Sequence, residues 1–69
     1  MMVRVVLLTS KGHHMAVVKS QEFESEAEAT VWAGTQMSEG TGEVAHIFEC
    51  ESKQSPSGYL IEIIRKQGR

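Results

Sequence analysis

The sequence lacks aspartate entirely, and it has one cysteine, one proline and no long hydrophobic run. A single cysteine, Cys50, excludes an internal disulfide, which favours a reducing cytoplasm over a secreted scaffold. No run of apolar residues exceeds four, as in Val5 to Leu8, so none is long enough for a transmembrane helix. The first residues also lack the apolar region and cleavage site of a secretory signal. We therefore expect a cytoplasmic protein that does not span a membrane.

The chain is short, and its length limits how much surface it can bury. Its 69 residues suffice for one domain, and a hydrophobic fraction of 41% is too high for a disordered chain. A domain of this size buries only about 60% of the surface that its unfolded chain exposes. Such a domain is marginally stable alone, so we expect it to associate with a partner or with a second copy.

Basic residues are missing from the middle of the chain. Between residues 20 and 52 there is no lysine or arginine, and there are eight glutamates, whereas residues 1–19 and 53–69 each carry a net charge of +3. This distribution predicts an acidic surface that binds a basic surface on another protein. The alternative is a solvated helix whose first turn takes glutamate because of the helix dipole. Direct binding of nucleic acid requires basic residues instead.

The hydrophobic pattern predicts four strands and one helix. The segments rich in β-branched and aliphatic residues are 2–9, 15–23, 43–51 and 59–66. The helix is predicted over residues 25–39, because Ser25 and Glu28 have the spacing of a capping box. Gly40 and Gly42 follow the helix and end it. The tail, 67–69, is expected to fray.

The predicted order, β-β-α-β-β, indicates an α+β fold. The simplest arrangement is a single two-layer domain over residues 1–69, with one helix packed on a four-stranded antiparallel sheet. A single helix covers one face of a sheet, yet the first and last strands are apolar on both faces. The face without a helix is predicted to carry Val6, Leu8, Leu60 and Ile64, with Ile47 as a further candidate. We expect a homodimer or a protein partner on this face, or else a strongly twisted sheet whose side chains cover each other.

The helix has one face that suits packing on the sheet. At 100° per residue, this face carries Ala29, Trp32, Ala33, Gln36 and Met37. Because aromatic side chains dominate small cores, we expect Trp32 to point toward the sheet. In the alternative, Trp32 is an exposed interface anchor, and Val31 and Ala27 face the sheet.

Residues suited to catalysis or metal binding are few. His13, His14, His46 and Cys50 lack the spacing of a zinc site. His46 and Cys50 lie four residues apart in a strand, about 13 Å, which is too far for a catalytic pair. The sequence has no phosphate-binding glycine motif that precedes a helix. We therefore expect no enzyme activity, no cofactor and no metal.

One stretch resembles a known kind of small protein. The segment Phe23–Ala29, followed by Trp32-Ala33 and then Gly42–Val44, resembles a pattern in very small phage-encoded α/β proteins, among them anti-CRISPR proteins and inhibitors of host RNA polymerase. The resemblance covers roughly residues 20–50. It implies stoichiometric inhibition of a host enzyme by an acidic surface that competes with nucleic acid for a basic site.

Three functional hypotheses follow. The first is a protein-interaction module, forming a homodimer and inhibiting a nucleic-acid-handling enzyme. Its acidic residues would be Glu22, Glu24, Glu26, Glu28 and Glu39. The second is a nucleic-acid-binding protein that uses basic residues of the first and last strands. It requires these ends to converge in space, which neighbouring first and last strands would permit. These residues are Arg4, Arg65, Lys66 and Arg69. The third is a structural unit for homodimerisation.

Overall fold

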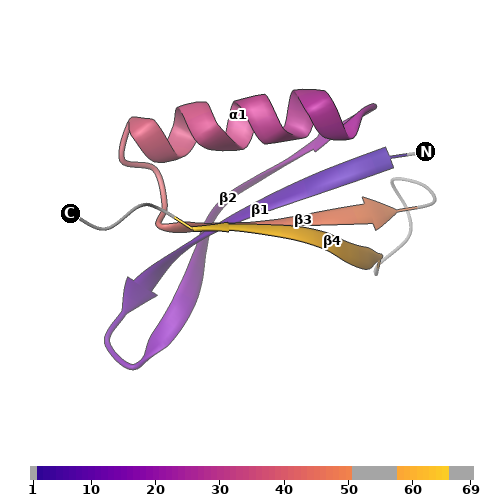
Figure 1. Cartoon of the computed structure of the whole chain (residues 1–69). Helices are drawn as coiled ribbons and strands as arrows, with labels where there is room; N and C mark the ends of the chain where they lie inside the picture. The colour runs from indigo at the N-terminus through magenta and orange to yellow at the C-terminus, as the bar shows by residue number, and fades with distance from the viewer. Residues whose placement is uncertain (1, 51–57, 66–69) are drawn as a thin grey trace.

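The computed structural model describes residues 2–50 and 58–65. Its elements, in chain order, are β1 (Met2–Lys11), β2 (His14–Phe23), α1 (Glu26–Ser38), β3 (Val44–Cys50) and β4 (Tyr59–Arg65). One helix lies on one side of a single sheet, which confirms the predicted α+β fold (Figure 1). Residue 51 of the predicted third strand, residue 66 of the fourth, and the tail 67–69 lie outside the described residues.

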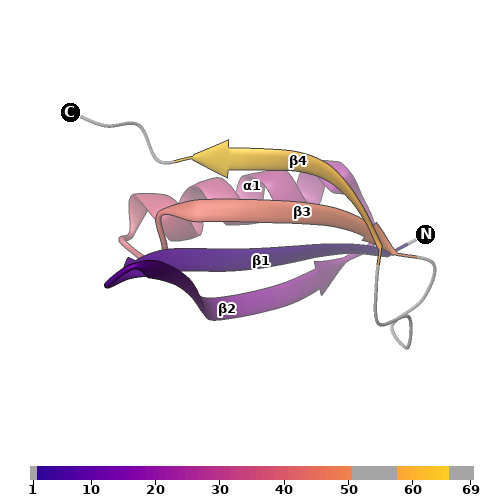
Figure 2. The same ribbon diagram turned by 90° about the horizontal axis from the view of Figure 1, so that it is seen from below.

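The sheet has the strand order β2-β1-β3-β4, and every neighbouring pair is antiparallel (Figure 2). Each hairpin supplies one central and one edge strand, and β1 and β3 pair at the centre. Because β3 lies between β1 and β4, the first and last strands are not neighbours. The adjacency that would have brought their basic residues together for the nucleic-acid hypothesis is therefore absent.

The first hairpin turns tightly at Gly12 and His13, between the paired residues Lys11 and His14. Gly12 has a φ of 67°, which glycine adopts without steric cost and which two-residue hairpin turns require. This local chemistry places β1 beside β2 and leaves β1 free to pair with β3 on its other side.

The helix begins where its capping residues predict. The Ser25 hydroxyl accepts a hydrogen bond from the Glu28 N–H at 3.2 Å, which is the serine half of the predicted capping box. The helix ends at Ser38, the N–H of the capping residue Glu39 bonds back to carbonyls of the last turn, and Gly40 follows with a φ of 92°. Both ends therefore satisfy backbone groups that would otherwise lack partners.

Ser25→Ala is expected to lower the free energy of unfolding by about 1 kcal/mol, because it leaves the first-turn N–H groups without this acceptor. Urea denaturation followed by circular dichroism measures the change. Ser38→Ala, an exposed position at the other end of α1, is the control and should change stability little. Equal losses for the two variants would contradict a capping role for Ser25.

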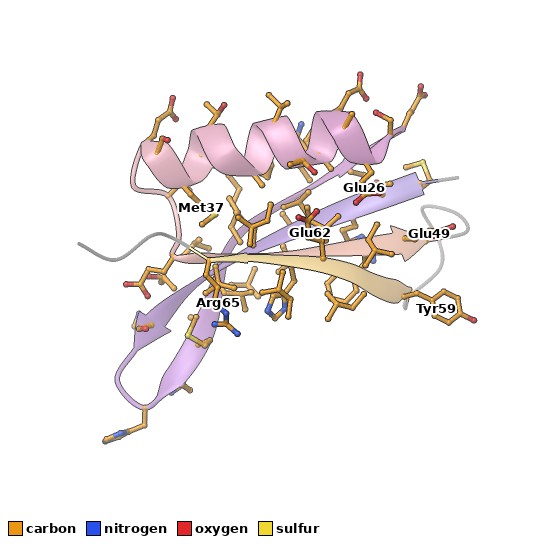
Figure 3. The ribbon with its side chains drawn as sticks, viewed as in Figure 1. Glu26, Met37, Glu49, Tyr59, Glu62 and Arg65 are labelled. Carbon is orange, nitrogen blue, oxygen red and sulfur yellow. The ribbon has the colours of Figure 1, made fainter. Side chains whose placement is uncertain are left out.

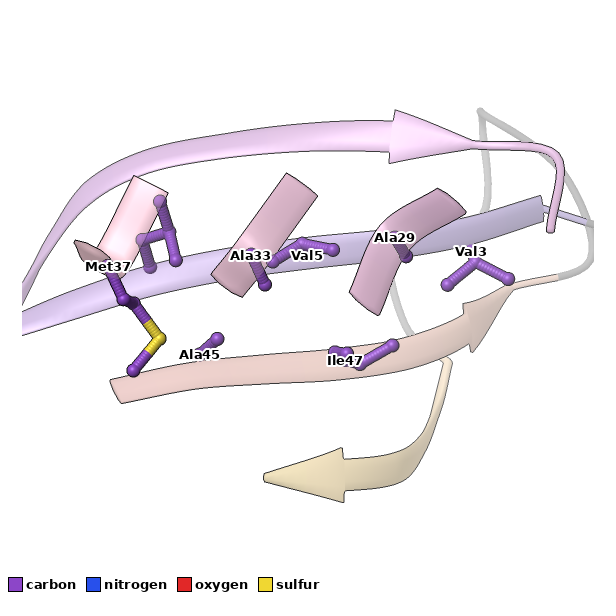
Figure 4. Packing of buried hydrophobic residues seen from close by; sticks show 8 residues of the cluster. Val3, Val5, Ala29, Ala33, Met37, Ala45 and Ile47 are labelled. Carbon is purple, nitrogen blue, oxygen red and sulfur yellow. The ribbon is translucent and has the colours of Figure 1, made fainter. Parts of the chain in front are cut away.

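The core lies between the helix and the two central strands. Val3, Val5 and Leu7 of β1 are fully buried, as are Ala45 and Ile47 of β3. The helix contributes small side chains and one methionine, as Figure 4 shows: Ala29, Ala33 and Met37. The alanines allow α1 to approach the sheet closely. The suggestion that Ile47 belongs to the face without a helix is therefore wrong.

Ile64 also lies on the helix side, contrary to expectation. It pairs with Ala45 and packs against the core. The register of β3 and β4 shifts between Ile47 and Phe48, so that Ile61 is an extra residue in β4. This bulge changes the alternation of side chains along the strand, so Leu60 and Ile64 point to opposite faces even though both numbers are even.

Trp32 packs at the border of the core. It is partly buried against the core cluster, its ring lies 5.4 Å from that of Phe23, and the Lys19 Nζ lies 5.8 Å from the Trp32 ring centroid. Val31 is 69% exposed and Ala27 is also exposed. The alternative in which these two residues face the sheet is therefore wrong.

Candidate interaction surfaces

Five exposed glutamates lie on the helix side of the molecule, and we call them the acidic surface. They come from the bend before α1, its first turn, β3 and β4: Glu24, Glu26, Glu28, Glu49 and Glu62. Figure 3 labels three of them on this side of the sheet. The strand register explains why they gather, because Phe23, at the end of β2, pairs with Val3, which also pairs with Glu49. The start of the helix and the end of β3 therefore share one end of the domain.

Two of the described cations of the sheet, Arg4 and Arg65, lie on the opposite face from this surface, whereas Lys19 lies on the helix side. The Lys19 Nζ lies over the Trp32 ring, beside β2. Arg4 donates hydrogen bonds to the Glu22 carboxylate, the shorter at 2.9 Å, on the opposite face of the sheet. Arg65 pairs with Val44, also on that opposite face. Arg4 and Arg65 therefore do not offset the negative charge of the acidic surface, and Lys19 lies nearest to Glu28, one turn of α1 before Trp32.

The structure divides the five glutamates that the sequence suggested. Glu24, Glu26 and Glu28 lie at the start of α1 on the helix side of the sheet, whereas Glu22 is paired with Arg4 on the other face. Glu39 caps the opposite end of a 13-residue helix, about 20 Å away by helical rise. Sequence reasoning missed Glu49 and Glu62 as members, since their placement depends on strand order and register.

The other face of the sheet is largely apolar apart from the Arg4–Glu22 ion pair and Arg65, and no described element covers it within residues 2–50 and 58–65. We call it the open face. It carries Val6, Leu8, Val17, His46, Phe48, Leu60 and Ile63. Cross-strand pairing arranges them in rows, with Val6 opposite His46 and His46 opposite Ile63. Val17 is 62% exposed, Leu60 48% and Ile63 40%.

Three of the four residues predicted for this face lie on it: Val6, Leu8 and Leu60. Ile64 does not, because of the bulge at Ile61. The prediction omitted His46 and Phe48, whose rings meet edge to face at 6.2 Å. Alternate residues of a strand share a face, so the spacing of Val44, His46 and Phe48 already indicated that these three lie on the same side of the sheet.

Groups suited to metal binding or catalysis do not converge in the part of the chain that the structure describes. There, no three histidine, cysteine or acidic side chains are placed to hold a metal ion. Cys50 is a buried free thiol. None of the helices in the described ranges is long and apolar enough to cross a membrane. The two surfaces above are therefore the features from which a function can be argued.

Comparison with known proteins does not add to this picture. No protein-family model matches the chain, and searches of curated proteins and of solved structures gave no match.

Proposed function

We propose that this protein is a binding module whose acidic surface attaches to a basic surface of a partner protein. The observation that carries the proposal is that five exposed carboxylates, from the bend before α1, from α1 itself and from two strands, lie on the helix side of the sheet. The helix dipole favours glutamate only in the first turn, at Glu26 and Glu28. It does not account for Glu49 and Glu62, which β3 and β4 bring to the same side. Binding to a basic partner surface accounts for the positions of all five glutamates.

The partner's chemistry follows from that surface. An array of carboxylates is complementary to the lysines and arginines with which a protein binds a phosphate backbone. We propose a nucleic-acid-handling enzyme as the partner, inhibited stoichiometrically because the acidic surface occupies its nucleic-acid site. This role involves no catalysis by the chain itself. A single free thiol, Cys50, is compatible with a reducing, cytoplasmic setting.

Glu49→Lys is expected to slow association with the partner about three- to tenfold at low salt, because the charge that steers encounter is reversed. The partner is first captured from a bacterial lysate on the immobilised chain and identified by mass spectrometry. Surface plasmon resonance then gives the association rate constant across a series of salt concentrations. The salt dependence should also become less steep in the variant.

Glu39→Lys is the matched control. It makes the same change of charge at an exposed residue, but at the far end of α1, and should leave the association rate nearly unchanged. If both variants associate alike, or if the wild-type rate does not vary with salt, the acidic surface is not the binding surface. Nucleic acid should also displace the chain from its partner. A stable ternary complex would contradict the inhibitory role.

A further inference from the structure

An exposed tyrosine lies beside one glutamate of the acidic surface. Tyr59, the first residue of β4, pairs with Glu49 of β3 in the antiparallel register. Directly opposed residues of such a pair share a sheet face, and their Cβ atoms lie about 5 Å apart. Tyr59 is therefore next to a carboxylate on the helix side, at the end of the sheet where Figure 3 labels both residues.

The Tyr59 side chain does not contribute to the core. It is 78% exposed, more than any other large hydrophobic side chain in residues 2–50 and 58–65, and it does not pack against the core cluster. Packing within the domain therefore does not explain an aromatic residue at this position. Tyrosine is enriched at protein interfaces, because its rigid ring covers a large area at a low cost in conformational entropy.

The bulge at Ile61 brings a second carboxylate to the same side. Tyr59 and Glu62 are three residues apart, and a regular strand would direct them to opposite faces. Because Ile61 is unpaired, Glu62 pairs with Ile47 instead. Ile47 lies two residues before Glu49 on the helix side, so the two glutamates are diagonal neighbours, about 7–8 Å apart. Bulges re-aim side chains in this way. We call the three residues the tyrosine cluster: Glu49, Tyr59 and Glu62.

The two carboxylates of the tyrosine cluster are available to a partner. Both glutamates are exposed. Among the described residues neither forms an ion pair, since the ion pair found there joins Arg4 and Glu22 on the opposite face. An aromatic ring attracts a cation through its quadrupole, and a neighbouring carboxylate attracts the same cation through its charge. The tyrosine cluster therefore combines two kinds of group that favour one cationic ligand.

We infer that the tyrosine cluster binds an arginine side chain of the basic partner, an inference that rests on the proposed function and specifies its chemistry. The planar guanidinium can stack on the Tyr59 ring while its N–H groups donate to the Glu49 carboxylate. Lysine presents a compact, strongly hydrated ammonium group, which gains less from an aromatic ring. Arginine also suits a nucleic-acid site, because the same fork of N–H groups binds phosphate.

Two peptides of equal charge test this preference, one of nine arginines and one of nine lysines. Isothermal titration calorimetry at low salt should show that the wild-type chain binds the arginine peptide at least two- to fivefold more tightly, the range of an exposed cation–aromatic contact. The chain has one tyrosine, so the NMR signals of the tyrosine ring report on Tyr59 alone. They should shift on addition of the arginine peptide. Equal affinities, or ring signals that do not move, overturn the inference.

Tyr59→Ala should weaken binding of the arginine peptide about two- to fivefold and binding of the lysine peptide less. Tyr59→Phe keeps an aromatic ring and should retain the wild-type affinities. Val17→Ala is the control, because Val17 is also an exposed strand residue, 62%, but lies on the open face in β2. It should change neither affinity. Equal weakening of both peptides by Tyr59→Ala would contradict an arginine site.

The outcomes also separate this inference from the proposed function. Glu49→Lys should weaken both peptides, because it reverses a charge of the acidic surface. If both peptides bind the wild type and Tyr59→Ala alters neither affinity, the arginine site is wrong and the acidic surface stands. If neither peptide binds at low salt, both proposals fail. If Tyr59→Ala does not fold by circular dichroism, the ring shifts of the wild type and the affinities of Tyr59→Phe decide.

Discussion

Ile47→Ala is expected to lower the free energy of unfolding by about 2–5 kcal/mol, a large share of the stability of so small a domain. Ile47 is fully buried between β1 and α1, where it opposes Val5. Its neighbours across the layer are the short side chains of Ala29 and Ala33, which cannot expand to fill a cavity. The loss therefore includes the transfer of the side chain and the cavity that remains. Urea denaturation with circular dichroism gives the value.

Ile63→Ala is the matched control for this prediction. It removes the same atoms from a side chain that is 40% exposed, so it should cost less than half as much. Equal costs for the two isoleucines would mean that the core does not lie where the structure places it.

The order of elements and the ends of the helix could be predicted because they depend on local chemistry. The Ser25 cap and the glycines after the helix are short-range signals, and each lies where it was expected. Which sheet face the helix covers depends on long-range packing. Ile47 and Ile64 were therefore placed on the wrong face. For Ile64 the cause is the bulge at Ile61, which no sequence pattern marked.

The acidic surface was predictable only in part, for the same reason. Glu24, Glu26 and Glu28 are close in sequence, so one short segment places them together. Glu49 and Glu62 join them through the β1–β3 and β3–β4 pairings, which cannot be read from spacing alone.

Gly42→Ala is expected to destabilise the domain by about 1–3 kcal/mol, for two separable reasons. Gly42 has a φ of 104°, a conformation that side-chain-bearing residues rarely adopt. An added Cβ would also lie 3.3 Å from the Leu7 Cβ and 3.4 Å from the Leu8 carbonyl oxygen. The segment between α1 and β3 is held against β1 here by the Glu43 N–H, which donates to that same carbonyl at 2.8 Å. It therefore cannot move away without breaking a hydrogen bond.

Two other glycines separate these reasons. Gly40 also has a positive φ, 92°, but an added Cβ there would meet nothing within 4 Å, so Gly40→Ala should cost only the conformational part, about 1 kcal/mol. Gly34 lies inside α1 with open space around it, and Gly34→Ala should stabilise the domain by about 0.5–1 kcal/mol because alanine favours the helix. Thermal and urea unfolding of the three variants gives the order. A Gly42→Ala loss no larger than that of Gly40→Ala would show that β1 yields to the added methyl group.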